Sequence, residues 1–492
     1  MEERVDPGGW PRAVARWQGP QLVVAGPGTG KTEFLVRRAL HLVNEEGIRP
    51  ERILLLSFSR RGAADLRYRV TAGLDRSLTR VSAFTFHGLA HRLLEAHGDP
   101  AGRLPTLLTG PEQVALVHEL LVAEDPARWP LPHRGLLATQ TFANEVADFV
   151  LRCREQLIDS GELARRAADR SDWRSLPGFL DRYEQALRRE HRIDYGSLQA
   201  RAVDLLADSP IAERIAEEYG HILVDEYQDT TLAQARLLAL LYRPHGNLTV
   251  AGDPYQSIYS FRGAELGNIA AFPGTFPDSS GAPARRIVLT TSFRVPAEIL
   301  DAAVRVTAGG RLPGGAGPVV PAPERGSVEV YRFDQLTHEA EWIAGTLERT
   351  HLREGIPYRR MAVLVRSKRH FLPELSRSLQ RRGIPHDPPE ARLADHPAVR
   401  SVLDLVEAAV HGSEDAVRRL LLGPLLALPL SAMRELQRRR ARSGAPWAEV
   451  IRTVDTEAGP LADLLDDPGW AAESPAAEGF WHLWSRLPAF AA

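Results

Sequence analysis

The segment LVVAGPGTGKTEFL, residues 22–35, constrains the fold more than any other part of the chain. It begins with an apolar run suited to a buried parallel strand, continues through a glycine-rich turn, and ends with residues at helical spacing. This order places backbone N–H groups and a helix N-terminus around a bound phosphate. The segment therefore predicts an α/β fold with a phosphate-binding loop. The expected loop residues are Ala25, Gly26, Pro27, Gly28, Thr29, Gly30, Lys31 and Thr32.

Lysine is almost absent from the chain, which makes Lys31 informative. Of the 61 lysine and arginine residues, only Lys31 and Lys368 are lysines. This bias is typical of a high-GC genome, so a remaining lysine indicates a position where a guanidinium does not serve. In a phosphate-binding loop the compact ammonium reaches between the β- and γ-phosphates, where a broad guanidinium fork fits poorly. Lys31 is therefore predicted to bind a nucleoside triphosphate.

A second strand-like run, HILV at 221–224, ends in two adjacent carboxylates, Asp225 and Glu226. A carboxylate at the end of such a strand is typical of an Mg²⁺ ligand, and we expect Asp225 to hold the ion together with the Thr32 hydroxyl. Glu226 is then expected to polarise an attacking water as a general base. Acidic pairs at strand ends also serve as ordinary caps, so this pair alone leaves both interpretations open.

Composition limits the class of protein. The chain has 492 residues, of which 44% are hydrophobic and 25% charged, enough for about two to four domains. The N-terminus is charged and no apolar stretch approaches the ~18 residues of a membrane span, which predicts a cytoplasmic protein without membrane contact. A single cysteine, Cys153, excludes an intrachain disulfide and a thiolate cluster for zinc. With a net charge of −2, any basic surface for nucleic acid has to be local.

Five motifs then follow one another in a recognisable order. They are AGPGTGKT (25–32), TFHGLAHRLL (85–94), DEYQDTT (225–231), VAGDPYQSIYSFRGAE (250–265) and LTTSFRVPAEIL (289–300). Together they resemble the UvrD/Rep family of superfamily 1 DNA helicases, over about residues 20–410. The resemblance implies ATP and Mg²⁺ as cofactors. It also implies an α/β fold of two RecA-like P-loop NTPase lobes with parallel sheets, with a helical subdomain inserted in each and the second lobe incomplete.

The resemblance implies roles for three further residues. Gln256 in GDPYQS would sense the γ-phosphate and couple hydrolysis to movement. Arg294 in SFR would act as an arginine finger that reaches the γ-phosphate from the second lobe, and Phe293 would stack on adenine where the family usually has tyrosine. A turn role for Gln256 and a surface position for Arg294 are the alternatives. Trp10 replaces the family's adenine-reading glutamine, so strict adenine recognition is not predicted.

Aromatic residues interleaved with arginines follow several expected strands, which places them in loops at the C-terminal edge of the sheet. Such rings stack on bases of any identity, although any one of them can instead belong to the core. Arg60 and Arg61 replace the Asn-Lys usual in the family, which adds charge for phosphates or only reflects the arginine bias. The expected contacts to single-stranded DNA are Phe58, Arg60, Arg61, Phe86, His87, Tyr259, Phe261 and Arg262.

The pattern of apolar runs divides the chain into a first lobe interrupted by a helical insertion, then a second lobe with its own insertion. Strand-like runs at 286–291, 327–333 and 361–367 are assigned to the second lobe. The expected segments are 1–98 with 191–278 for the first RecA-like ATP-binding lobe, 99–190 for the inserted helical subdomain, 279–411 for the partial second lobe, and 412–492 for the start of a second inserted helical subdomain.

The leading hypothesis is an ATP-dependent DNA helicase or translocase that moves 3′ to 5′ on single-stranded DNA and serves repair or recombination. The expected partners are single-stranded DNA, duplex/single-strand junctions, and a nuclease domain or subunit as in some relatives. The family's late motifs do not occur before Ala492, so we expect a truncated chain or a fragment of a longer helicase. The alternatives are a non-motor subunit that binds ATP and single-stranded DNA in a helicase–nuclease complex, and a small-molecule kinase, for which no acceptor-site residues are found.

Overall fold

The chain divides into two compact units, Met1–Glu329 and Val330–Ala492. None of the described helices combines the length and apolar character that a bilayer-spanning helix needs. The computed structural model describes residues 2–15, 19–74, 81–98, 104–207, 210–243, 246–259, 263–265, 267–307, 312, 314–386, 397–411, 413–423 and 430–444.

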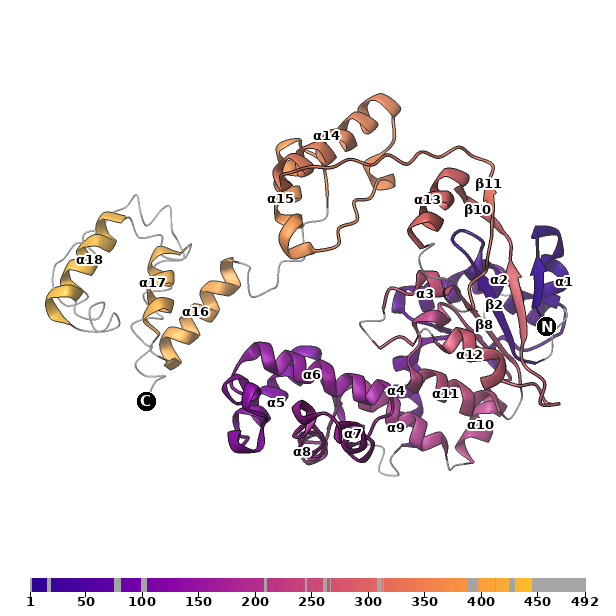
Figure 1. Cartoon of the computed structure of the whole chain (residues 1–492), viewed down its shortest axis with the longest axis horizontal. Coiled ribbons are helices and arrows are strands. Elements are labelled where there is room, and N and C mark those ends of the chain that lie inside the picture. The colour runs from indigo at the N-terminus through magenta and orange to yellow at the C-terminus, as the bar shows by residue number, and fades with distance from the viewer. Residues whose placement is uncertain are drawn as a thin grey trace. The chain divides into compact units, whose positions relative to one another are not determined.

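A seven-stranded parallel sheet forms the centre of the first unit (Figure 1). Strands β2, β3 and β8 are buried at every residue, as expected for a parallel sheet that is covered on both faces. In spatial order, the strands are β1 (Glu2–Val5), β9 (Arg285–Leu289), β2 (Gln21–Ala25), β8 (Leu248–Gly252), β7 (His221–Val224), β3 (Ile53–Ser57) and β4 (Ser82–Thr85).

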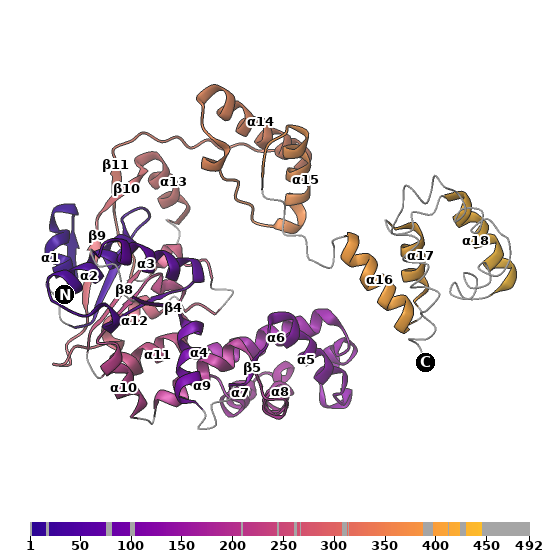
Figure 2. The same ribbon diagram turned by 180° about the vertical axis from the view of Figure 1, so that it is seen from behind.

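Helices cover the two faces of this sheet and make two separate cores. Because side chains alternate along a strand, Leu22 and Val24 of β2 pack into one core, and Val23 and Ala25 pack into the other. Figure 2 shows helices α1–α3 on one side of the sheet and α10–α12 on the other. The covering helices are α1 (Trp10–Ala15), α2 (Lys31–Asn44), α3 (Arg60–Ala72), α4 (Phe86–His97), α9 (Tyr195–Ala207), α10 (Ile211–Glu218), α11 (Leu232–Tyr242) and α12 (Gly267–Thr275).

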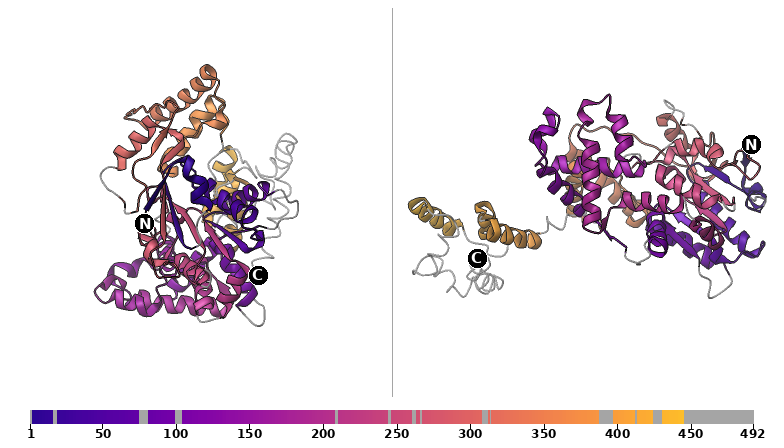
Figure 3. Two further views of the ribbon diagram at one scale, coloured as in Figure 1. Left: turned by 90° about the vertical axis from the view of Figure 1, so that its right-hand side faces the viewer. Right: turned by 90° about the horizontal axis from the view of Figure 1, so that it is seen from below.

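Four helices between α4 and α9 have a core of their own, in which Trp129, Phe179 and Tyr183 are almost fully buried (purple in Figure 3). At the base of this group a short strand β5 (Thr106–Leu107) pairs in parallel with β6 (Arg192–Ile193), where the chain enters and leaves it. The four helices are α5 (Gly110–Val122), α6 (Gln140–Glu155), α7 (Ser160–Ala167) and α8 (Leu176–Arg189). They fall within the segment 99–190.

After the sheet, a ribbon of β10 and β11 completes the first unit together with α13. In the second unit, α14 and α15 pack through a small core that contains Ala344, Leu375, Leu379 and Ile384. These elements, with the remaining helices, are β10 (Thr291–Pro296), α13 (Ala297–Thr307), β11 (Val320–Ala322), α14 (Leu336–Glu354), α15 (Lys368–Arg381), α16 (Pro397–His411), α17 (Glu414–Leu422) and α18 (Leu430–Ser443). The described 3₁₀ helices are Pro7–Gly9, Pro50–Arg52, Pro126–Arg128, Leu131–Leu136, Ser171–Trp173, Tyr227–Asp229, Pro254–Gln256 and Tyr358–Arg360.

The structure differs from the sequence-based assignment of the later strands. The run at 286–291 lies largely in β9, between β1 and β2 of the first sheet, so the expected boundary at 279 falls inside the first unit. Ile287, Val288 and Leu289 are buried in β9, which is paired on both sides. The runs at 327–333 and 361–367 pair with no strand among the described residues, and Val330 and Leu364 are 91% and 96% exposed.

One buried contact ties the inserted helices to the first lobe and provides a test of stability. The Tyr183 hydroxyl on α8 donates to Asp194 Oδ2 at 2.8 Å, and both residues are buried. We predict that Tyr183→Phe lowers the free energy of unfolding by about 1–3 kcal/mol, because a buried carboxylate loses one of its donors. Urea denaturation measures the change. Tyr68→Phe is the control, since Tyr68 is 73% exposed, and an equal loss in both variants would contradict the prediction.

Candidate nucleotide site

The expected nucleotide contacts all follow the carboxyl ends of parallel strands in the first sheet. The glycine-rich loop follows β2, the carboxylate pair follows β7, Gln256 follows β8, and Arg294 follows β9. Since parallel strands end at the same edge, residues more than 260 positions apart in the chain meet there. The site is therefore a direct product of the sheet order.

The loop between β2 and α2 requires glycine at two positions. Gly28 and Gly30 have φ values of 73° and 90°, which are left-handed and cost glycine little. A Cβ on Gly28 would lie 2.6 Å from the Ser292 hydroxyl oxygen, and one on Gly30 would lie 2.7 Å from the Trp10 ring. Both neighbours approach the loop so closely that no side chain fits there.

Lys31 is the first residue of α2, and only 8% of its side chain is exposed. Its Nζ donates to Glu226 Oε2 at 2.7 Å and to Gln256 Oε1 at 3.3 Å. One ammonium group thus joins the ends of three strands. A group this buried needs compensating charge, and here the carboxylate supplies it.

Thr32 and Asp225 form the pair expected to hold a divalent cation. The Thr32 hydroxyl donates to Asp225 Oδ2 at 2.8 Å. Asp225 is only 5% exposed, and burial together with the neighbouring Glu226 carboxylate raises the pKa of Asp225 to about 6. Hydroxyl and carboxylate oxygens are the ligands that Mg²⁺ prefers, and a cation would relieve the cost of this buried carboxylate. The residues present fit Mg²⁺.

A buried glutamine, Gln228, links the loops that follow β7 and β8. Its Nε2 donates to Glu226 Oε2 at 2.7 Å, and its Oε1 accepts the Asp253 N–H at 3.1 Å. Asp253 in turn accepts a hydrogen bond from Gln256 Nε2 at 2.8 Å. Glu226 has a left-handed φ of 54°, a strain of about 1–2 kcal/mol that the surrounding contacts hold in place. The network fixes the carboxylate relative to Gln256.

The SFR segment is bonded directly to the glycine-rich loop. The Phe293 N–H donates to the Gly28 carbonyl at 2.9 Å, and the Ser292 hydroxyl donates to the Pro27 carbonyl at 3.0 Å. Arg294, in β10, is exposed and belongs to the first unit. The expectation that it comes from a second lobe is wrong, because β9 lies beside β2 in the first sheet and delivers the segment to the same edge.

A cavity of about 650 Å³ opens over the loop, lined by Lys31, Glu226, Gln256 and Arg294 together with Trp10 and Phe293. Phe293 is 53% exposed, which leaves its ring available for stacking. Trp10 is 4% exposed, meets Phe293 edge-on at 5.8 Å between centroids, and has Arg37 over its ring at 5.2 Å. At the position of Trp10 the cavity wall is therefore aromatic, and it offers no side-chain amide there to form hydrogen bonds with a base.

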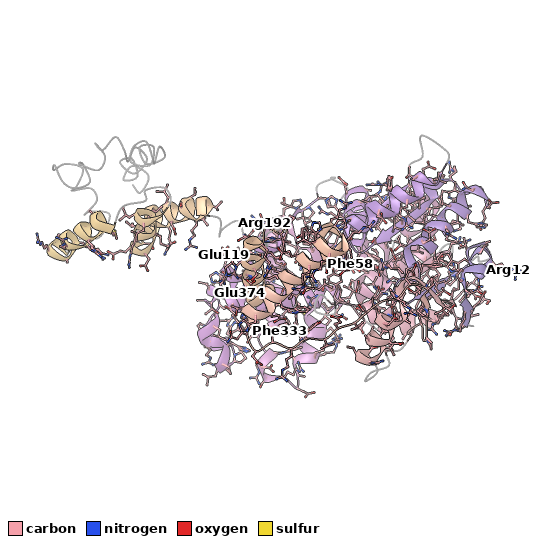
Figure 4. All side chains as sticks on the ribbon, turned by 90° about the horizontal axis from the view of Figure 1, so that it is seen from above. Arg12, Phe58, Glu119, Arg192, Phe333 and Glu374 are labelled. Atoms are coloured by element: carbon pink, nitrogen blue, oxygen red, sulfur yellow. The ribbon has the colours of Figure 1, made fainter. Side chains whose placement is uncertain are left out.

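A separate groove of about 670 Å³ runs between the first lobe and the inserted helices. Phe58, Arg60 and His87 line it, and the Phe58 ring stacks on Tyr259 with 4.5 Å between centroids (Phe58 is labelled in Figure 4). His87 meets Tyr195 edge-on at 5.3 Å. Burial lowers the pKa of His87 to about 4, so its imidazole is a neutral ring at pH 7.

The other expected DNA contacts divide into three cases. Arg61, like the groove residue Arg60 before it, is exposed on the first turn of α3. The prediction for Phe86 is wrong, because its side chain is only 2% exposed and packs in the core with the sheet. Phe261 and Arg262 lie outside the described residues.

Two residues with a clear place at the site, Gln228 and Asp253, received no role from the sequence. Both lie inside the motifs DEYQDTT and VAGDPYQS, and both are 1% exposed. Asp253 directly follows the apolar strand β8, which was an available signal, whereas Gln228 lies four residues after the end of β7. The sequence alone does not reveal which side chains cross between loops.

The sheet, the glycine-rich loop and the carboxylate pair define a P-loop nucleotide-binding fold. Residues 11–277 match the family described as UvrD/REP helicase N-terminal domain, more than half of the chain. The chain belongs to the UvrD/REP helicase family.

Several curated proteins are similar to it. "ATP-dependent DNA helicase PcrA" of Leuconostoc citreum is 27% identical over 464 residues, which cover 90% of this chain and 58% of that protein. "DNA helicase II" of Escherichia coli (strain K12) is 33% identical over 297 residues, 59% of this chain and 38% of the relative. "Probable DNA helicase" of Mycoplasma pneumoniae is 30% identical over 377 residues, 73% and 67% respectively. The chain thus spans less than three fifths of the length of PcrA.

The two glycines suggest a matched pair of substitutions. We predict that Gly28→Ala weakens ATP binding about tenfold or more, because the new Cβ clashes with Ser292 and the left-handed backbone is strained. Gly47 has a similar φ of 68° but would meet nothing within 4 Å, so Gly47→Ala is the control for backbone strain alone. Titration with a fluorescent ATP analogue measures both. Equal affinities in the two variants would contradict the crowding argument.

Proposed function

We propose that the chain binds ATP with Mg²⁺, hydrolyses it, and uses the energy to move along single-stranded DNA as a helicase or translocase. The observation that carries the proposal is the single network in which Lys31 holds both Glu226 and Gln256. It places a general base and a sensor each within hydrogen-bond distance of the phosphate-binding cation. Family membership and the names of the relatives support the same conclusion.

In this proposal the triphosphate lies along the glycine-rich loop, with its terminal phosphate at Lys31. The backbone N–H groups of the loop and the N-terminus of α2 supply further positive potential. Thr32 and Asp225 would hold Mg²⁺, which when bound neutralises charge on the phosphate oxygens. Phe293 offers a stacking surface to the base, and Trp10 limits how strictly that base is selected.

Hydrolysis requires Glu226 to become available as a base. Without nucleotide its carboxylate is held by the Lys31 ammonium. A γ-phosphate that takes over the ammonium would leave Glu226 held by Gln228 and directed by that amide. Arg294, which lines the same cavity, would then stabilise the charge that develops on the transferred phosphoryl group. Binding of ATP would thus free the Glu226 carboxylate from Lys31, so that it can act as the general base.

Communication with DNA follows the segment after β8. Gln256 is bonded to Lys31 and to Asp253, and Tyr259 lies three residues further along. A change at the γ-phosphate would shift Gln256 and, through the short segment, the ring of Tyr259 on Phe58. Opening this stack would admit a base between the two rings, which is sequence-independent contact of the kind a motor needs.

Finer aspects of the function are proposed from family membership. These are movement from 3′ to 5′, binding at duplex/single-strand junctions, a role in DNA repair or recombination, and location in the cytoplasm where bacterial DNA lies. A strand-displacement assay with 3′- and 5′-tailed duplexes tests the direction, and a preference for the 5′ tail would contradict it.

Glu226→Gln tests the catalytic role. We predict that ATP hydrolysis stimulated by single-stranded DNA falls about 10²–10⁴-fold, because the amide cannot accept the proton of the attacking water. ATP affinity should remain within about threefold, since glutamine still presents an oxygen to Lys31. A coupled ATPase assay and nucleotide titration measure the two quantities.

The control for this variant is Glu217→Gln, an exposed glutamate on α10. If Glu226→Gln changes hydrolysis no more than this control does, the chain is better described as a non-motor subunit that uses ATP as a structural ligand. If single-stranded DNA fails to stimulate hydrolysis in the unaltered protein, the helicase proposal is wrong.

Phe58→Ala tests the DNA groove. We predict a loss of about 1–3 kcal/mol in binding of an oligothymidylate, because one face of a stacked base loses its partner. Fluorescence anisotropy measures the affinity. Tyr68→Ala is the control, since Tyr68 is an exposed aromatic on α3 that does not line the groove. Equal affinities for the two variants would place the DNA elsewhere.

A further inference from the structure

A second, smaller cavity lies at the base of the inserted helices, apart from the nucleotide site. It has a volume of about 300 Å³, is open to solvent, and is lined by residues of α4, α8, α9 and β6 and by the segments beside them. Its apolar wall includes Leu94 and Ile193. Neither the nucleotide network nor the aromatic groove uses any of its residues.

Among the residues that the structure describes, the polar side chains that line this cavity are basic or neutral. They are Arg188, His191, Arg192 and Arg201, and none of the described aspartates or glutamates lines it (Arg192 is labelled in Figure 4). Arg188 pairs with Glu184 at 2.9 Å and Arg192 with Glu190 at 3.2 Å, but these arginines are 64% and 42% exposed. Pairs this exposed leave much of the positive potential of the cavity in place.

Arg201 is the least compensated of these residues. It is half-buried, and it makes no hydrogen bond or ion pair with any residue that the structure describes. Burial and Arg188 lower the pKa of Arg201, while smaller effects of Asp194 and Asp204 act in the opposite direction. Arg188 and Arg201 thus present two guanidinium groups to one cavity, an arrangement that suits a shared anionic ligand.

The backbone holds the cavity in this form. His191 has a left-handed φ of 52°, which ends α8 and turns the chain into β6. Its carbonyl accepts the Thr106 N–H at 2.9 Å, so the turn is fixed by the β5–β6 ribbon. A non-glycine residue keeps a strained backbone conformation only where the surrounding contacts hold it there. The backbone of His191 is therefore a fixed part of the cavity rim.

The cavity continues the aromatic groove along two helices. On α4, His87 and His91 line the groove, and Leu94 and the C-cap residue Gly98 line the cavity, all at the three- and four-residue spacing of one helical face. From His91 to Gly98 the helix rises about 10 Å. On α9, Leu198 lines the groove and Arg201, one turn later, lines the cavity.

We propose that this cavity binds a phosphate group between Arg201, Arg188 and Arg192. The phosphate comes either from a nucleic-acid strand that extends beyond the groove or from a free phosphate in solution. Only the nucleic-acid source rests on the proposed function, because the arginines recognise a phosphate whatever carries it. Experiments without nucleotide keep this test separate from that of hydrolysis.

The first arm tests free phosphate. In a Lys31→Ala background, which weakens anion binding at the glycine-rich loop, about 10 mM inorganic phosphate is compared with chloride at equal ionic strength. For a millimolar site we expect Tm to rise on the order of 2 °C. Adding Arg201→Gln should abolish the rise. Adding Arg165→Gln should not, since Arg165 is an exposed arginine of α7 that pairs with Glu162 and lies outside the cavity.

The second arm tests nucleic acid. Binding of an oligothymidylate to the otherwise unaltered chain is measured at several salt concentrations. Arg201→Gln should reduce the slope of log affinity against log salt by about 0.7, the value for one lost phosphate contact on a single strand. Arg165→Gln should leave the slope unchanged, and Arg201→Lys should retain most of it, because the charge remains.

The results of the two arms together test the proposal and identify the source of the bound phosphate. Loss of the phosphate response alone identifies free phosphate, and loss of salt slope alone identifies a nucleic-acid strand. Circular dichroism confirms that each variant is folded, and Arg192→Gln replaces Arg201→Gln if the latter is not. If the arginine substitution in the cavity changes neither the phosphate response nor the salt slope, the proposal is wrong.

Discussion

The hydrogen bonds of the Lys31 ammonium are the interaction on which the candidate site depends. Lys31 Nζ is 2.7 Å from Glu226 and 3.3 Å from Gln256, and these three residues follow three different strands. The parallel sheet makes the meeting possible, because it brings the carboxyl ends of β2, β7 and β8 to one edge. A buried cation that serves two loops at once also explains why lysine occurs here in a chain in which almost every other basic residue is arginine.

Much of the first lobe could be predicted because its signals are local. The strand, loop and helix around Lys31, and the strand that ends at Asp225, follow from short apolar runs and the residues directly after them. The same reasoning placed Arg60 and His87 beside a groove. In each case one segment of the chain contained the whole pattern.

Predictions failed where the answer depended on the neighbours of a segment. The apolar run at 286–291 predicts a strand but does not indicate which sheet the strand joins. Only the pairing of β9 with β1 and β2 places it in the first sheet. Phe86 has the same local context as His87, yet as the first residue of α4 it packs under the helix into the core. Gln228 gave no sign that its amide bridges two loops. Long-range contacts set all three outcomes.

The attachment of Arg294 has a mechanical consequence. Its backbone lies in β10, the ribbon through which the chain leaves the sheet, and the preceding residues are bonded to the carbonyls of Pro27 and Gly28. Under the proposed role, a pull transmitted along this ribbon would move the guanidinium relative to the fixed ammonium of Lys31. Load on the covalent connection would then alter the rate of phosphoryl transfer, and the hydrogen bonds to Pro27 and Gly28 would pass part of that load to the glycine-rich loop.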